Sequence, residues 1–371
     1  MWRIAFIRGA TTTDSLRFFL NDGFRVSRIT GPSVAGFTVS KQEDHSVIDV
    51  VLKPSQSRSD TITIDYDGRL HVPGDTINNI SSSWVELGLD SFWQPVFADF
   101  AHAIVGRVKL ALGRGFRVAT SGLATQSDDS LYTFITMNVP LPDIAFAASP
   151  ALSFADSGDT RVYFTGRSTP LVSRLLATAE TCSSFLNARF GQPTPLPARR
   201  IVLAPRAGPG YARKNYIVVT QLPDTASVAI ARFMCHELSH FWSSRANAAG
   251  PDNWLNEGFA EYVSAQFIRS TAGEAAYDRI VSAWREQSKG QGPVWTPSST
   301  RRPSEAISYR KAPYLLTELE ARVGTDRMRE IVRRYMTDPI PIGTTLELLA
   351  VIREAAGAET REWFADLLMH Q

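Results

Sequence analysis

Two histidines in the segment FMCHELSHFW, Phe233 to Trp242, have the spacing of metal ligands. His236 and His240 are four residues apart, so on a helix both imidazoles lie on one face and can converge on one ion. Glu237 stands between them, where its carboxylate can reach a water beside that ion. This pattern predicts a zinc site with its general base attached.

A catalytic zinc needs three protein ligands and an open position for water, so a third ligand is expected. The candidate is Glu257 in WLNEGFAEY, because a pair of antiparallel helices would bring its face against that of His236 and His240. The alternative is an exposed helix carboxylate. Glu261 lies one turn later on the same face and can accept a hydrogen bond from the outer nitrogen of a ligating histidine, although an exposed carboxylate is an equally ordinary interpretation.

The segments HELSH, WLNEGFAEY and YRKAPYLL resemble the zinc aminopeptidases of the aminopeptidase N and leukotriene-hydrolase type, which are gluzincins. TITIDYDGRL, WVELGLDSFWQPVFADF and RFGQPTPLPARRIVLAP extend the resemblance upstream. It implies an α+β fold, with an N-terminal antiparallel β domain followed by a thermolysin-like, mostly helical zinc catalytic domain. It also implies one Zn2+ per chain held by His236, His240 and Glu257, with Glu237 as general base and Tyr309 as the phenol that stabilises the oxyanion.

The chain departs from the family pattern in two places. His240 and Glu257 enclose sixteen residues, Phe241 to Asn256, which is shorter than the family spacing and would be absorbed by a shorter loop at RANAAGPD. The family also carries a strand motif, GAMEN, whose glutamate grips the free α-amine of the substrate. Here the matching region reads GPGYARKN, with no carboxylate.

Arg213 and Lys214 are the expected substrate-binding residues of that region, and Lys214 stands about where the glutamate should be. A cation there would repel an ammonium group and favour a carboxylate, an acidic side chain or a blocked N-terminus. The alternative is that both side chains face solvent and the amine is unrecognised. Tyr309 also has an alternative interpretation, as a buried tyrosine that anchors the start of a helix.

The elements that must position these residues fall into two predicted domains. Residues 1–147 consist of short alternating or β-branched runs broken by Gly, Asp and Asn, which indicates an antiparallel β domain. Residues 148–371 are the predicted catalytic domain, with a long helix over 170–191, strands at RRIVLAP and NYIVVTQ, and helices through both motifs, the second capped by Asn253. Further helices are expected near 273–288, 312–323, 326–336, 344–356 and 359–369.

Composition limits the partners of the chain. Thirty-nine Lys and Arg against 37 Asp and Glu give a net charge of +2, so no nucleic acid or anionic membrane is expected as a partner. No segment has the length of a membrane span and no signal peptide is recognised, so we expect a cytoplasmic protein. Cys182 and Cys235 make no disulfide framework and are expected to be reduced thiols. The oligomeric state stays open.

Together these features predict a zinc metallopeptidase that hydrolyses peptide bonds, aminopeptidase-like but with altered recognition of the N-terminus. Two alternatives are kept. One is a zinc hydrolase that acts on another amide or ester, or on one dedicated peptide partner. The other is a non-catalytic, zinc-stabilised binding module. The presence of Glu237 and Tyr309 favours catalysis, because a scaffold has no need of a general base.

Overall fold

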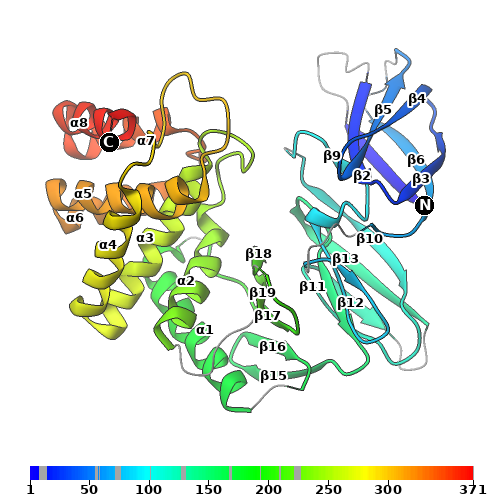
Figure 1. Cartoon of the computed structure of the whole chain (residues 1–371), viewed down its shortest axis with the longest axis horizontal. Coiled ribbons are helices and arrows are strands. Elements are labelled where there is room, and N and C mark those ends of the chain that lie inside the picture. The colour runs from blue at the N-terminus through cyan, green and yellow to red at the C-terminus, as the bar shows by residue number, and fades with distance from the viewer. Residues whose placement is uncertain are drawn as a thin grey trace. The chain divides into compact units, whose positions relative to one another are not determined.

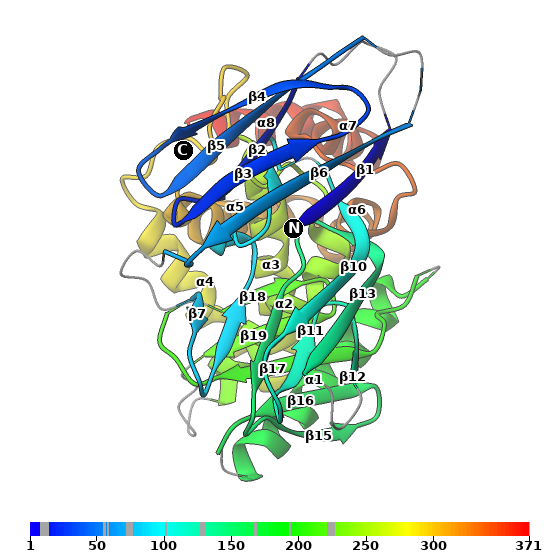
Figure 2. The same ribbon diagram turned by 90° about the vertical axis from the view of Figure 1, so that its right-hand side faces the viewer.

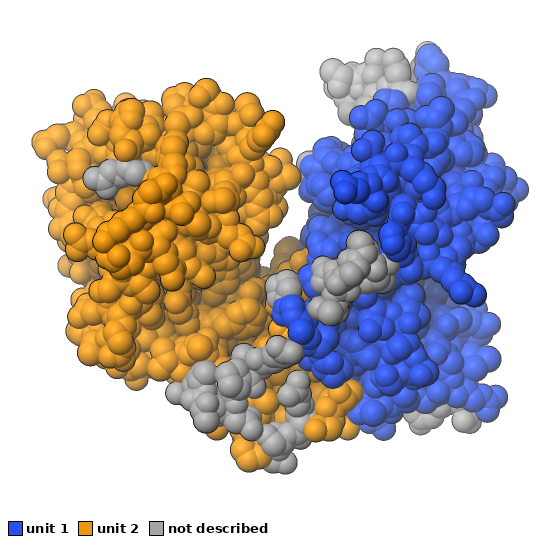
Figure 3. Space-filling view, viewed as in Figure 1, with its two compact units in different colours: residues 1–152, 204–209 blue, residues 153–203, 210–371 orange. Residues whose placement is uncertain are grey.

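The computed structural model describes residues 1–7, 15–54, 57, 59–71, 77–100, 102–126, 131–166, 169–192, 194–208, 210–220 and 227–370. Strands make up the first part of the chain and helices most of its last part (Figures 1 and 2), which confirms the predicted fold class. The chain divides into two compact units (Figure 3). The first unit contains residues 1–152 and 204–209, and the second contains residues 153–203 and 210–371.

The described strands of the first unit form antiparallel sheets. Two sheets lie toward the N-terminus, in the orders β1 (Trp2–Ile7), β6 (Ser59–Gly68), β3 (Phe24–Thr30) and β4 (Val34–Lys41), β5 (His45–Leu52), β2 (Ser15–Asn21), β9 (Val96–Phe97). Two more have the orders β10 (Ile104–Ala111), β13 (Tyr132–Leu141), β12 (Leu123–Gln126) and β11 (Arg117–Thr120), β14 (Phe146–Ser149), β8 (Val85–Leu87), β7 (Asn79–Ile80). A short 3-10 helix, η1, covers Leu89–Ser91.

Alternating side chains explain these strands. Ile62 and Ile64 of β6 are buried against a core that includes Phe18, while Thr63 between them is half exposed. Such period-two burial is what an antiparallel sheet with one covered face requires. Residues 204–209 are held in this unit by Arg206, whose guanidinium lies 2.6 Å from the buried carboxylate of Glu86.

The second unit begins with a five-stranded sheet in the order β15 (Ser153–Ser157), β16 (Thr160–Phe164), β17 (Arg199–Ala204), β19 (Tyr216–Thr220), β18 (Tyr211–Arg213). The strands predicted at RRIVLAP and NYIVVTQ are thereby confirmed as β17 and β19. Strands β16 and β17 are parallel, and helix α1 (Thr169–Phe190), which connects them, packs on β15 and β16. A helix in this crossover position is what two parallel neighbours need.

The rest of the second unit is helical: α2 (Ser227–Ser243), α3 (Asn253–Ala272), α4 (Glu274–Ser288), the π-helix η2 (Ile307–Lys311), α5 (Ala312–Val323), α6 (Thr325–Thr337), α7 (Thr345–Ala356) and α8 (Ala358–His370). The five helices predicted after residue 272 agree with α4 to α8 to within one residue at each end. Among the described residues, no helix combines the length and apolar character that a membrane crossing needs.

Two local predictions are wrong. Helix α3 has Asp252 rather than Asn253 at its N-cap, and the Asp252 carboxylate accepts hydrogen bonds from the backbone amide and hydroxyl of Thr345 instead of capping its own helix. Cys182 of α1 and Cys235 of α2 form a disulfide, with Cα atoms 5.6 Å apart, and are not reduced thiols. The packing of α1 on α2 brings these cysteines together across 53 residues of sequence.

Candidate active site

Helices α2 and α3 pack side by side and carry the motif residues. Met234 and Leu238 of α2 are fully buried in the core, which fixes the rotation of the helix about its axis. Helix α3 is buried along most of its length because other helices pack around it. The faces of the two helices that carry the motifs meet.

Asn256 of α3 secures the short connection between these helices. Its side-chain oxygen accepts hydrogen bonds from the backbone amides of Arg245 and Ala246, both at 2.9 Å, and its amide nitrogen donates to the carbonyl oxygen of Ala246 at 3.0 Å. Arg245 donates in turn to the carbonyl oxygens of Met336 and Asp338 at 2.6 and 2.7 Å. The shorter spacing noted in the sequence is thus accommodated by a loop tied at both ends.

The two histidines and Glu257 meet at one point. The Nε2 atoms of His236 and His240 are 3.1 Å apart, and Oε2 of Glu257 lies 3.5 Å from the first and 3.3 Å from the second. The imidazole planes are nearly perpendicular, at 88°. Among the described residues, this is the group of three metal-binding side chains whose ligand atoms all fall within 4.8 Å of one another.

The chemistry of this cluster fits a metal ion. Oε2 of Glu257 is buried and accepts no hydrogen bond from any described residue, although two imidazole nitrogens face it. A buried carboxylate oxygen without a donor is costly, and a cation shared with the two nitrogens would satisfy all three atoms. Two imidazoles and one carboxylate form a usual donor set for catalytic zinc.

Glu261 lies behind His236, in the place that one of its two interpretations from the sequence requires. Its Oε1 is 3.4 Å from Nδ1 of His236, the ring nitrogen turned away from Glu257. Its other oxygen accepts a hydrogen bond from Arg232, and Arg310 lies 3.8 Å from Oε1. Burial would raise the pKa of Glu261, but His236 and Arg232 outweigh it and lower that pKa to about 2. A carboxylate held ionised in this place is suited to orient the imidazole of a ligating histidine.

Proton affinities in the cluster follow from its charges. Burial alone would lower the pKa of His236, but the carboxylates of Glu257 and Glu261 outweigh it and raise that pKa to about 10. Burial would raise the pKa of Glu257, yet the neighbouring imidazoles hold it well below its usual range. Without a metal ion, the raised pKa favours the protonated form of His236, and a cation would have to displace that proton.

Glu237 is the remaining carboxylate beside the cluster. The residue is buried, and its carboxylate makes no hydrogen bond to a described residue, so the carboxylate is available to a water molecule. Burial, opposed by His236 and His240 and assisted by the two other carboxylates, raises the pKa of Glu237. A raised pKa suits a general base that must take up a proton and later return it.

Tyr309 reaches the site from the π-helix η2. Its ring stacks on that of His236, with centroids 5.7 Å apart and an angle of 19° between the planes. Helix α5, which follows η2, comes close to α3 at Gly258, where a Cβ atom would lie 3.0 Å from Cβ of Ala312. Burial and the negative charges of Glu257 and Glu237 raise the pKa of Tyr309 well above its usual value, so its hydroxyl stays a donor.

Lys311, at the end of the same π-helix, was not singled out from the sequence. Its side chain is buried, and Nζ donates to the carbonyl oxygens of Gln291 and Gly292 at 3.1 and 2.7 Å. The loop that follows α4 is thereby fastened to the turn that carries Tyr309. A π-helical turn in this position is consistent with a functional site.

Arg213 and Lys214 belong to the β18–β19 hairpin. Arg213 ends β18, and its guanidinium donates to the carbonyl oxygen of Ala212 at 2.9 Å. Lys214 lies in the turn with a φ of 56°, so the alternation of side chains along a strand does not decide where it points. The hairpin lies against α2, because a Cβ atom at Gly210 would be 2.8 Å from the ring of Phe233.

Comparison with known proteins agrees with this geometry. Residues 211–363 match the peptidase family M1 domain. The chain is 27% identical to the probable aminopeptidase 1 of Saccharolobus solfataricus over 207 residues, which is 49% of this chain and 26% of the relative. It is also 27% identical to leucine aminopeptidase 2 of Aspergillus terreus over 240 residues, which is 58% of this chain and 38% of the relative. The chain thus spans well under half the length of these curated relatives.

Solved structures share the fold over nearly the whole chain. The M1 zinc metallopeptidase of Deinococcus radiodurans superposes with a TM-score of 0.74 at 17% identity, covering 99% of this chain and 89% of that one. The native LTA4 hydrolase of yeast superposes with a TM-score of 0.77 at 16% identity, covering 100% of this chain and 64% of that one.

The second unit therefore contains the domain of a zinc metallopeptidase family. Residues 211–363 match the M1 peptidase domain, and the predicted resemblance to the zinc peptidases of the aminopeptidase N type, which are gluzincins, is confirmed.

Proposed function

We propose that this chain is a zinc-dependent metallopeptidase, aminopeptidase-like but with altered recognition of the substrate N-terminus. The observation that carries the proposal is the convergence of His236, His240 and Glu257 within 4.8 Å, with Glu237 in the same helical turn as the histidines. His236, His240 and Glu257 would hold one Zn2+. When bound there, zinc supplies a Lewis acid that polarises a carbonyl group and lowers the pKa of water toward about 7.

The residues of the chain supply the remaining chemistry. Glu237 accepts a proton from the water that attacks the carbonyl carbon, and returns it to the nitrogen of the leaving amine. Tyr309 donates a hydrogen bond to the oxygen on which negative charge develops. Glu261 holds the ring of His236 in place and is itself oriented by Arg232. These roles require one acid-base group, one neutral donor and one fixed carboxylate, and the raised and lowered pKa values agree with them.

Altered recognition of the N-terminus rests on the hairpin sequence GPGYARKN, which contains Arg213 and Lys214 and no carboxylate. Strand β18 of this hairpin packs against α2. Burial lowers the pKa of Lys214, so its ammonium group is partly desolvated. A desolvated cation attracts an anion more strongly than a solvated one does. The proposed substrates are therefore peptides whose N-terminal end is acidic or blocked.

The zinc-loaded protein incubated with a mixed peptide library tests the proposed function, with the cleaved bonds identified by mass spectrometry. Glu237→Gln should retain zinc while cleavage falls by about two orders of magnitude or more. Glu286→Gln is the matched control, because Glu286 is exposed and lies on α4. Cleavage by Glu237→Gln at the wild-type rate would refute the mechanism, and stoichiometric zinc without cleavage of any peptide would favour a hydrolase of other bonds or a binding module.

A further inference from the structure

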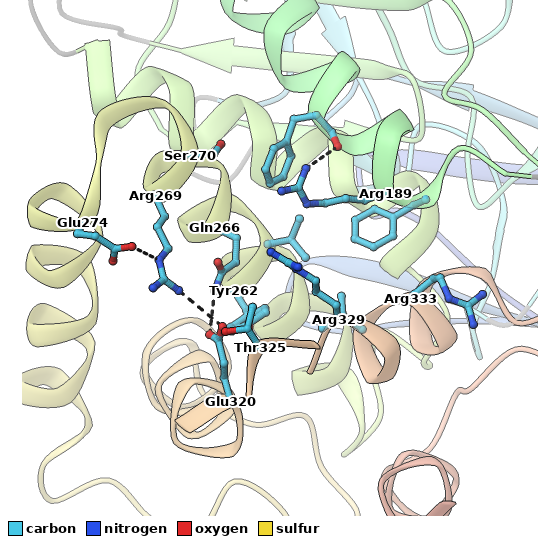
Figure 4. A pocket seen from close by; sticks show the side chains of 14 residues that line it. Arg189, Tyr262, Gln266, Arg269, Ser270, Glu274, Glu320, Thr325, Arg329 and Arg333 are labelled. Carbon is cyan, nitrogen blue, oxygen red and sulfur yellow. Dashed lines mark hydrogen bonds and ion pairs between the residues drawn. The ribbon is translucent and has the colours of Figure 1, made fainter. Parts of the chain in front are cut away.

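Helices of the second unit line a half-open pocket of about 800 Å3, and His236, His240 and Glu257 are not among the residues that line it. The end of α1, the middle of α3, the end of α5 and the start of α6 form its walls (Figure 4). Tyr262 and Gln266 of α3 face this pocket, whereas Glu257 and Glu261 face α2. The volume lies in the range of about 300–1,000 Å3 that small-molecule sites occupy.

The acidic side of the pocket is made by Glu320 and Glu274, which share one arginine. The Glu320 carboxylate accepts hydrogen bonds from the hydroxyl of Tyr262 at 2.9 Å and the amide of Gln266 at 3.0 Å, and Arg269 lies 3.6 Å from it. Arg269 also donates to Glu274 at 2.6 Å. Because two carboxylates share one guanidinium, this wall has a formal charge of −1 and offers no unpaired cation to an anionic ligand.

The opposite side of the pocket carries the positive charges of Arg189 and Arg329 and no buried carboxylate among the described residues that line it. Figure 4 shows Arg189 of α1 and Arg329 of α6 extending into the pocket from two sides. Arg189 donates to the carbonyl oxygen of Phe185 at 3.2 Å, and its Cζ atom lies 3.5 Å from the centroid of the Phe185 ring. Arg189 makes no ion pair with any described residue. The partner of Arg329 is Asp326, 3.2 Å away and almost fully exposed.

Arg189 and Arg329 both carry positive charge and extend into the same pocket, so each disfavours the protonated form of the other. Partial burial and then the positive charge of Arg329 lower the pKa of Arg189, which is the direction that repulsion between the two groups predicts. An anion between the guanidinium groups would remove this repulsion and accept hydrogen bonds from both. Arginine is well suited to carboxylate and phosphate groups because its planar fork binds two oxygens at once.

Apolar side chains stand next to these arginines. Phe190 of α1, Val263 of α3 and Val332 of α6 are buried residues that line the same pocket, and the Phe185 ring lies beneath Arg189. These side chains belong to the hydrophobic core, and their edges form the apolar part of the pocket lining. The lining therefore suits a molecule with one anionic group and an apolar body.

We infer that this pocket, separate from the proposed zinc site, binds a small amphiphilic anion whose carboxylate or phosphate group lies between Arg189 and Arg329 and whose apolar part packs against Phe190 and Val332. The inference does not depend on the proposed peptidase activity, since none of these residues takes part in it.

Calorimetric titration of the intact protein tests the inference, with 4-phenylbutyrate and phenyl phosphate as amphiphilic anions, 4-phenylbutanol as the neutral analogue and inorganic phosphate as the bare anion. At least one amphiphilic anion should bind more tightly than both comparison compounds. Arg189→Gln and Arg329→Gln should each weaken its binding by about tenfold or more, as expected for loss of a charge-assisted hydrogen bond. Arg327→Gln is the matched control, because Arg327 is exposed on α6 outside the pocket.

Arg189 also lies in the last turn of α1, so a helix-capping role is the competing explanation. Thermal melts of each variant without ligand separate the two, because capping alone would lower the stability of Arg189→Gln and leave binding by Arg329→Gln unchanged. The inference is overturned if the neutral analogue binds as tightly as the anions, if no anion binds, or if Arg329→Gln binds like Arg327→Gln.

Discussion

Arg232 donates a hydrogen bond to Glu261, and the other carboxylate oxygen of Glu261 lies 3.4 Å from Nδ1 of His236. Arg232 lies four residues before His236 on α2, so both side chains are on the same face of the helix. Glu261 contacts both of them. A chain of three side chains thus runs from the wall of the site to the metal-binding cluster.

The first prediction concerns this chain of contacts. Glu261→Gln and Arg232→Gln should each weaken zinc affinity by about 10–100-fold. The first removes the carboxylate that would orient the imidazole, and the second removes the arginine that holds this carboxylate. Glu257→Ala should abolish stoichiometric zinc, whereas Glu286→Gln should bind zinc as the wild type does. Competition with a chromogenic chelator gives the affinities. Equal affinity in wild type and Glu261→Gln would contradict the role given to Glu261.

The second prediction concerns pH. The pKa of His236 is raised to about 10 in the metal-free protein, so at pH 7 this imidazole carries a proton that zinc must displace. Zinc affinity should therefore rise with pH, by about tenfold per unit while His236 remains the group that loses a proton. Glu257 adds no proton, because its pKa is lowered.

Calorimetry measures the displaced proton directly. Zinc titrations at pH 7 in two buffers of different ionisation enthalpy should differ in heat by the equivalent of about one proton or more. Identical heats in the two buffers would show that His236 is neutral before zinc binds.

The disulfide between Cys182 and Cys235 gives the third prediction. It joins α1 to α2 one residue before His236, and both cysteines are fully buried. Because it closes a long loop in the unfolded chain, replacing both cysteines by alanine should lower the free energy of unfolding by about 2–4 kcal/mol. Urea unfolding of the oxidised wild type and of the double variant measures the difference. Alkylation of two thiols in the denatured, unreduced protein would contradict the disulfide.

Particular residues show how much could be predicted from the sequence. His236, His240 and Glu237 were predictable because helix geometry alone fixes their relation, and the helices from α4 to α8 followed from their periodicity and end signals. Arg232 could have been found as well, because it lies one turn before His236 on the same face. No local pattern revealed Cys182 beside Cys235, since that contact depends on how α1 packs against α2.

The contacts of Lys311 and Asp252 could not be predicted from the local sequence either, because they join segments that are far apart in the chain. The sequence around Lys311 resembles an ordinary helix start, and only the folded chain places its ammonium group under the carbonyl oxygens of Gln291 and Gly292. Asp252 rather than Asn253 precedes α3, and its carboxylate binds Thr345, far along the sequence, instead of capping the helix. Long-range partners override local capping preferences.

The fourth prediction concerns the turn that carries Tyr309. Tyr309→Phe should lower kcat by about a hundredfold with little change in KM, because the hydroxyl acts only on the developing charge. Lys311→Met should lower kcat by about tenfold, since the loop and the π-helix lose their two shared hydrogen bonds. Lys289→Met is the control, because that lysine is exposed in the same region. Steady-state kinetics on one cleaved peptide measure both constants, and an unchanged kcat in Tyr309→Phe would remove the proposed role.

The last prediction concerns the end of the substrate that the β18–β19 hairpin would meet. Arg213 and Lys214 bring positive charge to a hairpin that packs against α2, and burial lowers the pKa of Lys214. A peptide with a free ammonium group should therefore be cleaved more slowly than the same peptide with an acetylated or an acidic N-terminus. Lys214→Glu should reverse this order, because a carboxylate there attracts an ammonium group, and Arg213→Ala should reduce the preference for the acidic peptide. Comparison of kcat/KM for the three peptides across wild type and both variants measures the order, with Lys289→Met as the control for loss of a surface cation. The role of the hairpin is refuted if the wild type prefers the free amine, or if neither substitution changes the ranking of the three peptides.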